Sequence, residues 1–193
     1  MKTSHDFGLF TLDVRADFEE MAQRLRTVGN QAPHVIRRAI NRVGDKARTK
    51  VVRALVKQTG AKYGTVRRAL KIRRANYGEL AYRIVGFGGF LPLSAFSARQ
   101  RKDGVSAAPW GTRRVFKQAF ISPSLGGHVF VREVHGGSRV GRLPIRELFG
   151  PAIPRELLKD DVKATFESTV AAELPVAAER ELGALLSGFA PRG

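Results

Sequence analysis

The chain has 193 residues, of which 43% are hydrophobic and 26% are charged, which is the composition of a globular protein rather than of a disordered basic tail. It carries 34 Lys and Arg against 17 Asp and Glu, a formal net charge of +17. No apolar run approaches the roughly 18 residues of a membrane-spanning helix, and the first residues lack the apolar stretch of a signal peptide. We therefore expect a protein made in the cytosol, with no membrane partner. The sequence contains no cysteine, which excludes disulfides, thiolate zinc sites and cysteine nucleophiles.

The positive charge is concentrated in the first three quarters of the chain. Residues 15–75 hold seventeen basic and four acidic side chains, and residues 76–150 hold eleven and four. Residues 151–193 are slightly acidic, with five basic and seven acidic side chains. This uneven excess indicates an acidic partner surface, which nucleic acid, another protein or the acidic C-terminal helix would supply.

The N-terminal third is expected to be mainly helical. A short strand is predicted at residues 10–14, where apolar and polar residues alternate, and apolar residues at helical spacing predict a helix over 17–28. Pro33 suits the first turn of a long helix over residues 33–59, and Gly60 is expected to cap the end of that helix. A short helix follows near residues 63–70, and an extended stretch begins at Ile72.

The long helix has one apolar face and several basic ones. Its apolar positions hold the helical period: Ile36, Ile40, Val43, Ala47, Val51 and Leu55. The candidate contacts for DNA or for an acidic protein are Arg37, Arg38, Arg42, Arg53, Arg67, Arg68, Arg73 and Arg74. The long helix and the short helix after it also have the outline of a helix-turn-helix, although a solvated helix face explains the same charges.

Between residues 80 and 134 the helical period disappears. The segments AYRIVGFGGF, GVSAAPWGT, RRVFKQAFI and GHVFVREV, separated by Gly, Pro, Asp and Ser, predict the strands of an antiparallel sheet. The polar segment from Ala98 to Ser106 is a candidate mobile arm between apolar strands. Both faces of the GHVFVREV strand contain apolar residues, so helices or another subunit are expected to cover them.

After residue 154 the helical period returns, with apolar positions along one broad face of a C-terminal helix: Leu157, Leu158, Val162, Phe166, Val170, Leu174, Leu182 and Leu185. Pro175 is expected to kink or split this helix. The order predicts an α+β fold with N-terminal helices, a central, mainly antiparallel β-sheet and a kinked C-terminal helix. We expect one compact unit with a basic helical region (1–75), a β-rich region (76–153) and a C-terminal helix (154–193).

No catalytic or metal-binding motif can be assembled. The four histidines have no ligand spacing, no nucleophile elbow is present, and GFGGF at residues 86–90 lacks the lysine-serine ending of a phosphate loop, so it is interpreted as the end of a strand. We predict a protein that is not an enzyme and needs no metal or other cofactor. Trp110 is interpreted as a core or turn aromatic, with an interface anchor as the alternative.

Several blocks in the second half of the chain resemble prophage minor tail protein Z, the family of tail completion proteins of long-tailed phages. They are LPLSAFSARQ, GVSAAPWG, FKQAFI, HVFVREV and, as the best single match, RLPIRELFGP. AINRVGDKARTKVVRAL and TGAKYGTVRRALKIRRA are similar to the helical first half of that family, so the resemblance covers about residues 30–160.

The resemblance implies a virion structural protein at the head-proximal end of the tail, assembled in the host cytoplasm, that helps to finish the tail and to join it to the head. It implies a homo-oligomer, with a hexameric ring as the expected form, and contact with tail terminator or tail-tube proteins, with head-completion proteins and with the packaged DNA end. The alternative is a nucleic-acid-binding module that uses the Arg- and Lys-rich helices.

The block from Arg142 to Pro154 is assigned a packing role. Its prolines fix the backbone direction, and its apolar residues are expected to anchor it in the core or in a neighbouring subunit, while Arg146 and Glu147 point outward. The residues assigned to packing or to an interface are Trp110, Pro144, Ile145, Leu148, Phe149, Gly150 and Pro151.

Overall fold

The computed structural model describes residues 10–15, 29–135, 138–139 and 144–188. Its helices are α2 (Ala32–Thr59), α3 (Tyr63–Arg68), α4 (Ile153–Leu157) and α5 (Asp160–Leu186). Its strands are β1 (Phe10–Arg15), β2 (Leu70–Arg73), β3 (Ala81–Gly86), β4 (Phe90–Pro92), β5 (Arg99–Arg101), β6 (Gly104–Ala107), β7 (Arg114–Lys117), β8 (Ala119–Ser122), β9 (His128–Arg132), β10 (Val134–His135), β11 (Ser138–Arg139), β12 (Ile145–Glu147) and β13 (Phe149–Ala152). The predicted α+β class, with helices around a central region of antiparallel strands, is confirmed.

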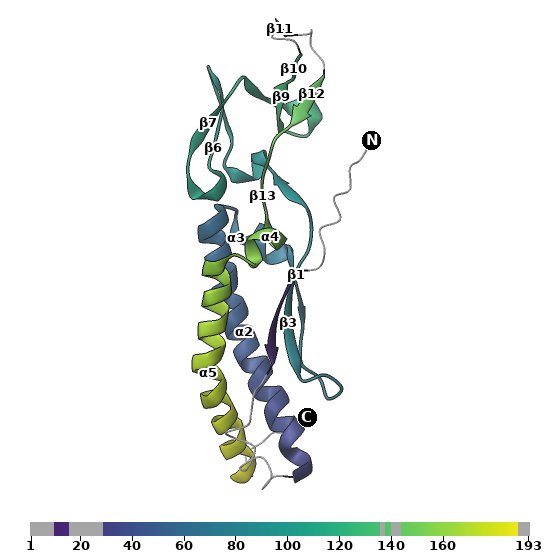
Figure 1. Cartoon of the computed structure of the whole chain (residues 1–193), viewed down its shortest axis with the longest axis vertical. Coiled ribbons are helices and arrows are strands. Elements are labelled where there is room, and N and C mark those ends of the chain that lie inside the picture. The colour runs from purple at the N-terminus through teal and green to yellow at the C-terminus, as the bar shows by residue number, and fades with distance from the viewer. Residues whose placement is uncertain (1–9, 16–28, 136–137, 140–143, 189–193) are drawn as a thin grey trace.

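The molecule is elongated, with a pair of long helices at one end and short strands at the other (Figure 1). α2 and α5 pack side by side and run in opposite directions. The predicted long helix and its cap are confirmed, because Gly60 ends α2 in the left-handed region, at a φ of 71°, and its N–H donates to the carbonyl of Val56. The predicted short helix is confirmed as α3 and the predicted first strand as β1. The helix expected over residues 17–28 lies outside the described residues.

A three-stranded sheet of order β1-β3-β2 lies against α2. The packing is close at Gly44, where an added Cβ would overlap the ring of Tyr82 from β3. Tyr82 is fully buried, and so are Ile40, Val43 and Leu55 of α2. The apolar stripe predicted for the long helix therefore faces the sheet and α5 as one continuous core.

The β-rich end is built from several small sheets instead of the single sheet that was expected. They are β5-β6-β7, β12-β9-β8, β4-β13 and β10-β11, all antiparallel. The segment RRVFKQAFI forms two strands, because Gln118 at φ 61° turns the chain between β7 and β8. Pairing of β6 with β7 and of β8 with β9 then assigns these two strands to different sheets.

The arm predicted from Ala98 to Ser106 is a β-hairpin of β5 and β6. Gly104, Val105 and Ser106 are buried, and Val105 belongs to the main core. The polar residues that suggested a free arm lie on β5 and in the turn, while β6 packs inward. This interpretation as a mobile arm was therefore wrong.

The C-terminal helix continues through Pro175 from Asp160 to Leu186, so of the two expected alternatives, a kink or a split, the split does not occur. Proline removes the donor for the carbonyl four residues earlier, which is that of Ala171. Ala171 and Pro175 are both exposed, so water can reach the carbonyl that the proline leaves without a helix donor.

Candidate functional site

The basic residues of α2, α3 and β2 form a stretch without any acid. From Lys46 to Gly78 the sequence has eleven Lys and Arg and no Asp or Glu. The acids nearest in the sequence are Asp45 and Glu79, which border the stretch on either side, so a carboxylate partner for its cations must come from these two residues, from elsewhere in the fold or from another molecule. We call the exposed cations of this stretch the basic face.

One flank of α2 is neutralised by the acidic C-terminal helix. The carboxylate of Glu181 on α5 accepts Arg38 Nε at 2.8 Å and Arg42 Nη2 at 3.0 Å. Two turns away, Lys46 Nζ lies 2.7 Å from a carboxylate oxygen of Glu173 and thereby lowers the pKa of that carboxyl. Because the two helices are antiparallel, these pairs form a ladder between them.

The eight arginines singled out from the sequence fall into two groups. Four have a partner in the chain: Arg38 and Arg42 pair with Glu181, Arg74 pairs with Asp45, and Arg37 lies 4.6 Å over the ring of Tyr77. The other four are exposed and have no ion pair within the described part of the chain: Arg53, Arg67, Arg68 and Arg73. The free group comes from the C-terminal half of α2, from α3 and from β2.

A polar pocket of about 290 Å³ lies where these elements meet. It is lined by Asp45, Arg48, Thr49, Val52, Tyr63, Arg67 and Arg74. Asp45 holds two neighbours in place: its Oδ2 accepts Arg74 Nη2, and its Oδ1 accepts the Tyr82 hydroxyl at 3.0 Å. The hydrogen bond and charge of Asp45 raise the pKa of Arg74. The pKa of the Tyr82 phenol is also raised, mainly by burial and to a smaller extent by the hydrogen bond with Asp45.

The packing block runs from one small sheet to another. β12 pairs with β9, and β13 pairs with β4. Between them, the Leu148 N–H donates to the carbonyl of Val129, and the Leu148 carbonyl accepts from the N–H of Leu93. Gly150 and Pro151 are buried, and a Cβ on Gly150 would overlap the ring of Phe96. Ile145 and Leu148 are half-buried and Pro144 is exposed.

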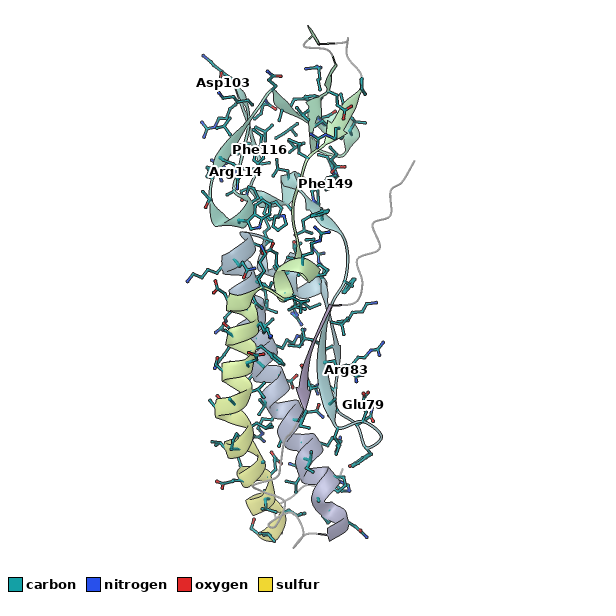
Figure 2. The ribbon with its side chains drawn as sticks, in the orientation of Figure 1. Glu79, Arg83, Asp103, Arg114, Phe116 and Phe149 are labelled. Carbon is teal, nitrogen blue, oxygen red and sulfur yellow. The ribbon has the colours of Figure 1, made fainter. Side chains whose placement is uncertain are left out.

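Phe149 is 51% exposed, and Figure 2 shows it in the narrow part of the molecule between the small sheets and the helices. It is outside the core of its own chain, which leaves the neighbouring-subunit alternative open for this residue. Arg146 is exposed, as expected, whereas Glu147 is half-buried and pairs with His128. The expectation that Glu147 points outward was wrong, because β12 pairs with β9 and places Glu147 near the start of that strand.

A buried carboxylate connects the helices with the β-rich end. Glu156 of α4 is 4% exposed and accepts hydrogen bonds from Gln58 at the end of α2, from Trp110 Nε1 at 3.3 Å and from Lys159 at 2.7 Å. Burial raises the pKa of Glu156, but these three donors outweigh burial, so the pKa is lowered overall. We call this cluster the Glu156 junction.

Trp110 occupies a strained position at this junction. It lies in a short 3₁₀ turn with a φ of 55°, a value that bulky residues seldom adopt, and the residue is 43% exposed. The hydrogen bond to Glu156 and the guanidinium of Arg114, 5.7 Å from the ring centre, hold it there. It is a turn residue with an exposed ring, so the interface alternative also stays open.

Sequence reasoning missed the acids that organise the site: Asp45, Glu156 and Glu181. A signal was present for Glu181, which follows Leu174 and Ala178 at helical steps and therefore occupies a core position of α5. An acid at such a position predicts a buried partner. Arg48 was overlooked because nothing in the sequence separates it from its basic neighbours.

The described residues contain no group of three or more His, Asp or Glu side chains close enough to hold a metal ion. Within the same residues, no helix is both long and apolar enough to cross a membrane. The Nδ1 atom of His34 forms a hydrogen bond of 2.8 Å with the hydroxyl of Tyr77. The GFGGF segment contains the end of β3 and the start of β4, as predicted.

Comparison with known proteins gives one result. Residues 18–188 match the family described as "Prophage minor tail protein Z (GPZ)". No curated protein and no solved structure matches the chain. Since the matched range covers the helices, the small sheets and the packing block, the chain belongs to the prophage minor tail protein Z family and is a structural protein of the phage tail.

Proposed function

We propose that the protein is a tail completion protein that acts at the head-proximal end of the tail. It assembles as a ring, with a hexamer as the expected form, around the channel through which DNA passes. In this role it contacts tail-tube or tail terminator proteins on one side and head-completion proteins on the other, and it makes the tail competent to join a filled head. The family match over residues 18–188 carries this proposal.

Exposed apolar side chains support a role in assembly. Large apolar residues that are 40% exposed or more include Phe90, Trp110, Val115, Leu125 and Phe149. Aromatic residues are enriched in the cores of protein interfaces, and a chain that exposes several of them gains free energy when a partner covers them. These five residues all lie at or beyond the junction between helices and small sheets.

The test is reconstitution of tails made without this protein. Adding the wild-type chain should restore joining to filled heads, and light scattering should show an oligomer, alone or with the tail terminator ring. Phe149→Glu should reduce joining at least about tenfold, because a charge at a hot-spot position costs more than 1.4 kcal/mol. Val176→Glu on α5, where Val176 is 64% exposed, is the control. If the chain remains a monomer and does not bind purified tails, the proposal is contradicted.

A nucleic-acid-binding module is the second candidate function. The observation that favours it is the acid-free stretch, in which nine of the eleven cations have no ion pair within the described residues. Counterion release then predicts that DNA affinity falls steeply between about 50 and 200 mM salt. A chain that binds no DNA at low salt rules this function out.

A further inference from the structure

Arginines from three separate elements converge on the pocket beside α2. Arg48 comes from α2, Arg67 from α3 and Arg74 from the segment after β2, and all three line one pocket. We propose that this pocket is a binding site for a phosphate group of the DNA backbone, with Arg48 and Arg67 as its cationic ligands. The inference rests on the second candidate function and names its site.

The fold brings these side chains together through regular spacing. Arg48, Thr49 and Val52 lie three, four and seven residues after Asp45, so the four residues share one face of α2. Tyr63 and Arg67 are one turn apart on α3 and close the pocket from the other side. α2 and α3 both lie within the part of the chain that packs on the main core, through Val52 and Val66.

The charges of the pocket favour an anion. Three arginines line it against one aspartate, and that aspartate is already occupied by Arg74 and by the Tyr82 hydroxyl. Arg48 and Arg67 have no ion pair within the described residues. Their guanidinium groups carry several donors in a planar fork, which suits the oxygens of a phosphate.

The surroundings favour a phosphate within a polyanion over a single carboxylate. Arg53 and Lys57 follow Thr49 at four-residue steps along α2, so a row of two cations leads away from the pocket. Exposed Arg68, Lys71 and Arg73 continue the basic face beyond Arg67. A regularly repeated anion such as a nucleic-acid backbone can contact such a row at several points.

The surface is also too polar for the core of a protein interface. Residues 46–74 are all described, and among their large apolar and aromatic side chains only Tyr63 is exposed. Interfaces with DNA are more polar and more positively charged than interfaces between proteins. Because backbone contacts carry no sequence information, we expect binding without sequence preference.

The experiment measures binding of the full chain to a fluorescently labelled DNA duplex by anisotropy, over a series of salt concentrations. The test variant is Arg48→Gln with Arg67→Gln. The control is Arg99→Gln with Arg101→Gln, which removes the same charge from exposed residues of β5. Thermal melting verifies that both variants fold. If the double pocket variant does not fold, Arg67→Gln alone replaces it as the test variant.

We expect the pocket variant to bind at least about tenfold more weakly at 100 mM salt, and the slope of log affinity against log salt to fall by about 2, which corresponds to two lost phosphate contacts. The control should change affinity less than about threefold. Equal losses in the two variants overturn the proposal, since they show that net charge alone matters.

Two further outcomes separate this inference from the functions it is linked to. If the wild-type chain binds no DNA at low salt, both the second candidate function and the pocket are rejected. If the wild-type chain binds DNA and the pocket variant binds it equally well, only the pocket proposal is rejected. If that variant then fails to support tail joining, the pocket binds an acidic protein instead of DNA. Failure of the wild-type chain to join tails leaves the pocket result unaffected.

Discussion

The helical end and the β-rich end of the molecule are built in different ways. α2 and α5 share one long contact, with apolar side chains inside and Arg-Glu and Lys-Glu pairs across the edge. The β-rich end consists of strands of two to five residues in separate small sheets, and it exposes Val115, Leu125 and Phe149. The first end buries one continuous apolar core between its elements, while Val176 and Leu186 of α5 remain exposed on its surface. The second exposes aromatic and aliphatic side chains at or beyond the junction, where a partner could cover them.

The largest effect should come from the core of the β-rich end. Phe96 is 1% exposed and packs against Gly150, so Phe96→Ala should lower the free energy of unfolding by about 3–5 kcal/mol. Urea denaturation followed by circular dichroism measures the change. Phe149→Ala removes the same side chain from an exposed position and should cost less than about 1 kcal/mol. Equal costs would mean that the β-rich end does not combine a buried core with an exposed Phe149 in the way described.

An intermediate effect is expected at the Glu156 junction. Glu156→Gln should cost about 2 kcal/mol at pH 7, because it weakens the bonds from Lys159, Gln58 and Trp110 in a buried site. The folded pKa of Glu156 lies below its unfolded value. The ionised carboxylate therefore stabilises the fold above the unfolded pKa of about 4.3, and this stability is lost as the pH falls through the folded pKa.

Stability measured from pH 7 down to pH 3 should accordingly fall more steeply in the wild-type chain than in Glu156→Gln. Glu173, whose pKa is also lowered, contributes in the same direction and remains in both proteins. Parallel pH profiles would show that the Glu156 carboxylate does not join the two ends of the molecule.

The smallest effect is expected within the helix pair. Glu181→Gln removes the charge that Arg38 and Arg42 share and should cost about 1 kcal/mol at low salt, and less at 1 M salt, because both arginines are partly exposed. Thermal melting at the two salt concentrations measures this. Glu167→Gln, on the same helix but 61% exposed, should have almost no effect. A loss that does not depend on salt would indicate a role in packing instead.

The sequence was most informative where structure repeats locally. The apolar period and Gly60 were sufficient to predict α2 and its end, since both act within a few residues. The small sheets were not predictable one by one, because Gln118 gave no turn signal and the pairing of β4 with β13 joins segments more than fifty residues apart in the sequence. The packing block could be named from the sequence, but the exposure of Phe149 could not.

The basic site shows the same limit. The excess of arginine was visible in the sequence, whereas the division into paired and unpaired arginines depends on α5, which lies more than one hundred residues away and supplies Glu181 and Glu173. The pocket depends on three elements meeting around Asp45, an acid that looks like an isolated exception in the sequence. Local patterns predict which residues are charged, and tertiary packing determines which charges remain available.

Trp110 also has a practical consequence. It is the sole tryptophan of the chain, it is partly exposed to solvent, and its indole N–H donates to Glu156 at the junction. Intrinsic fluorescence excited at the tryptophan band therefore reports on this one place in the molecule, without a label. A shift of its emission during oligomer formation or contact with a tail would show whether the connection between the two ends changes as the particle is built.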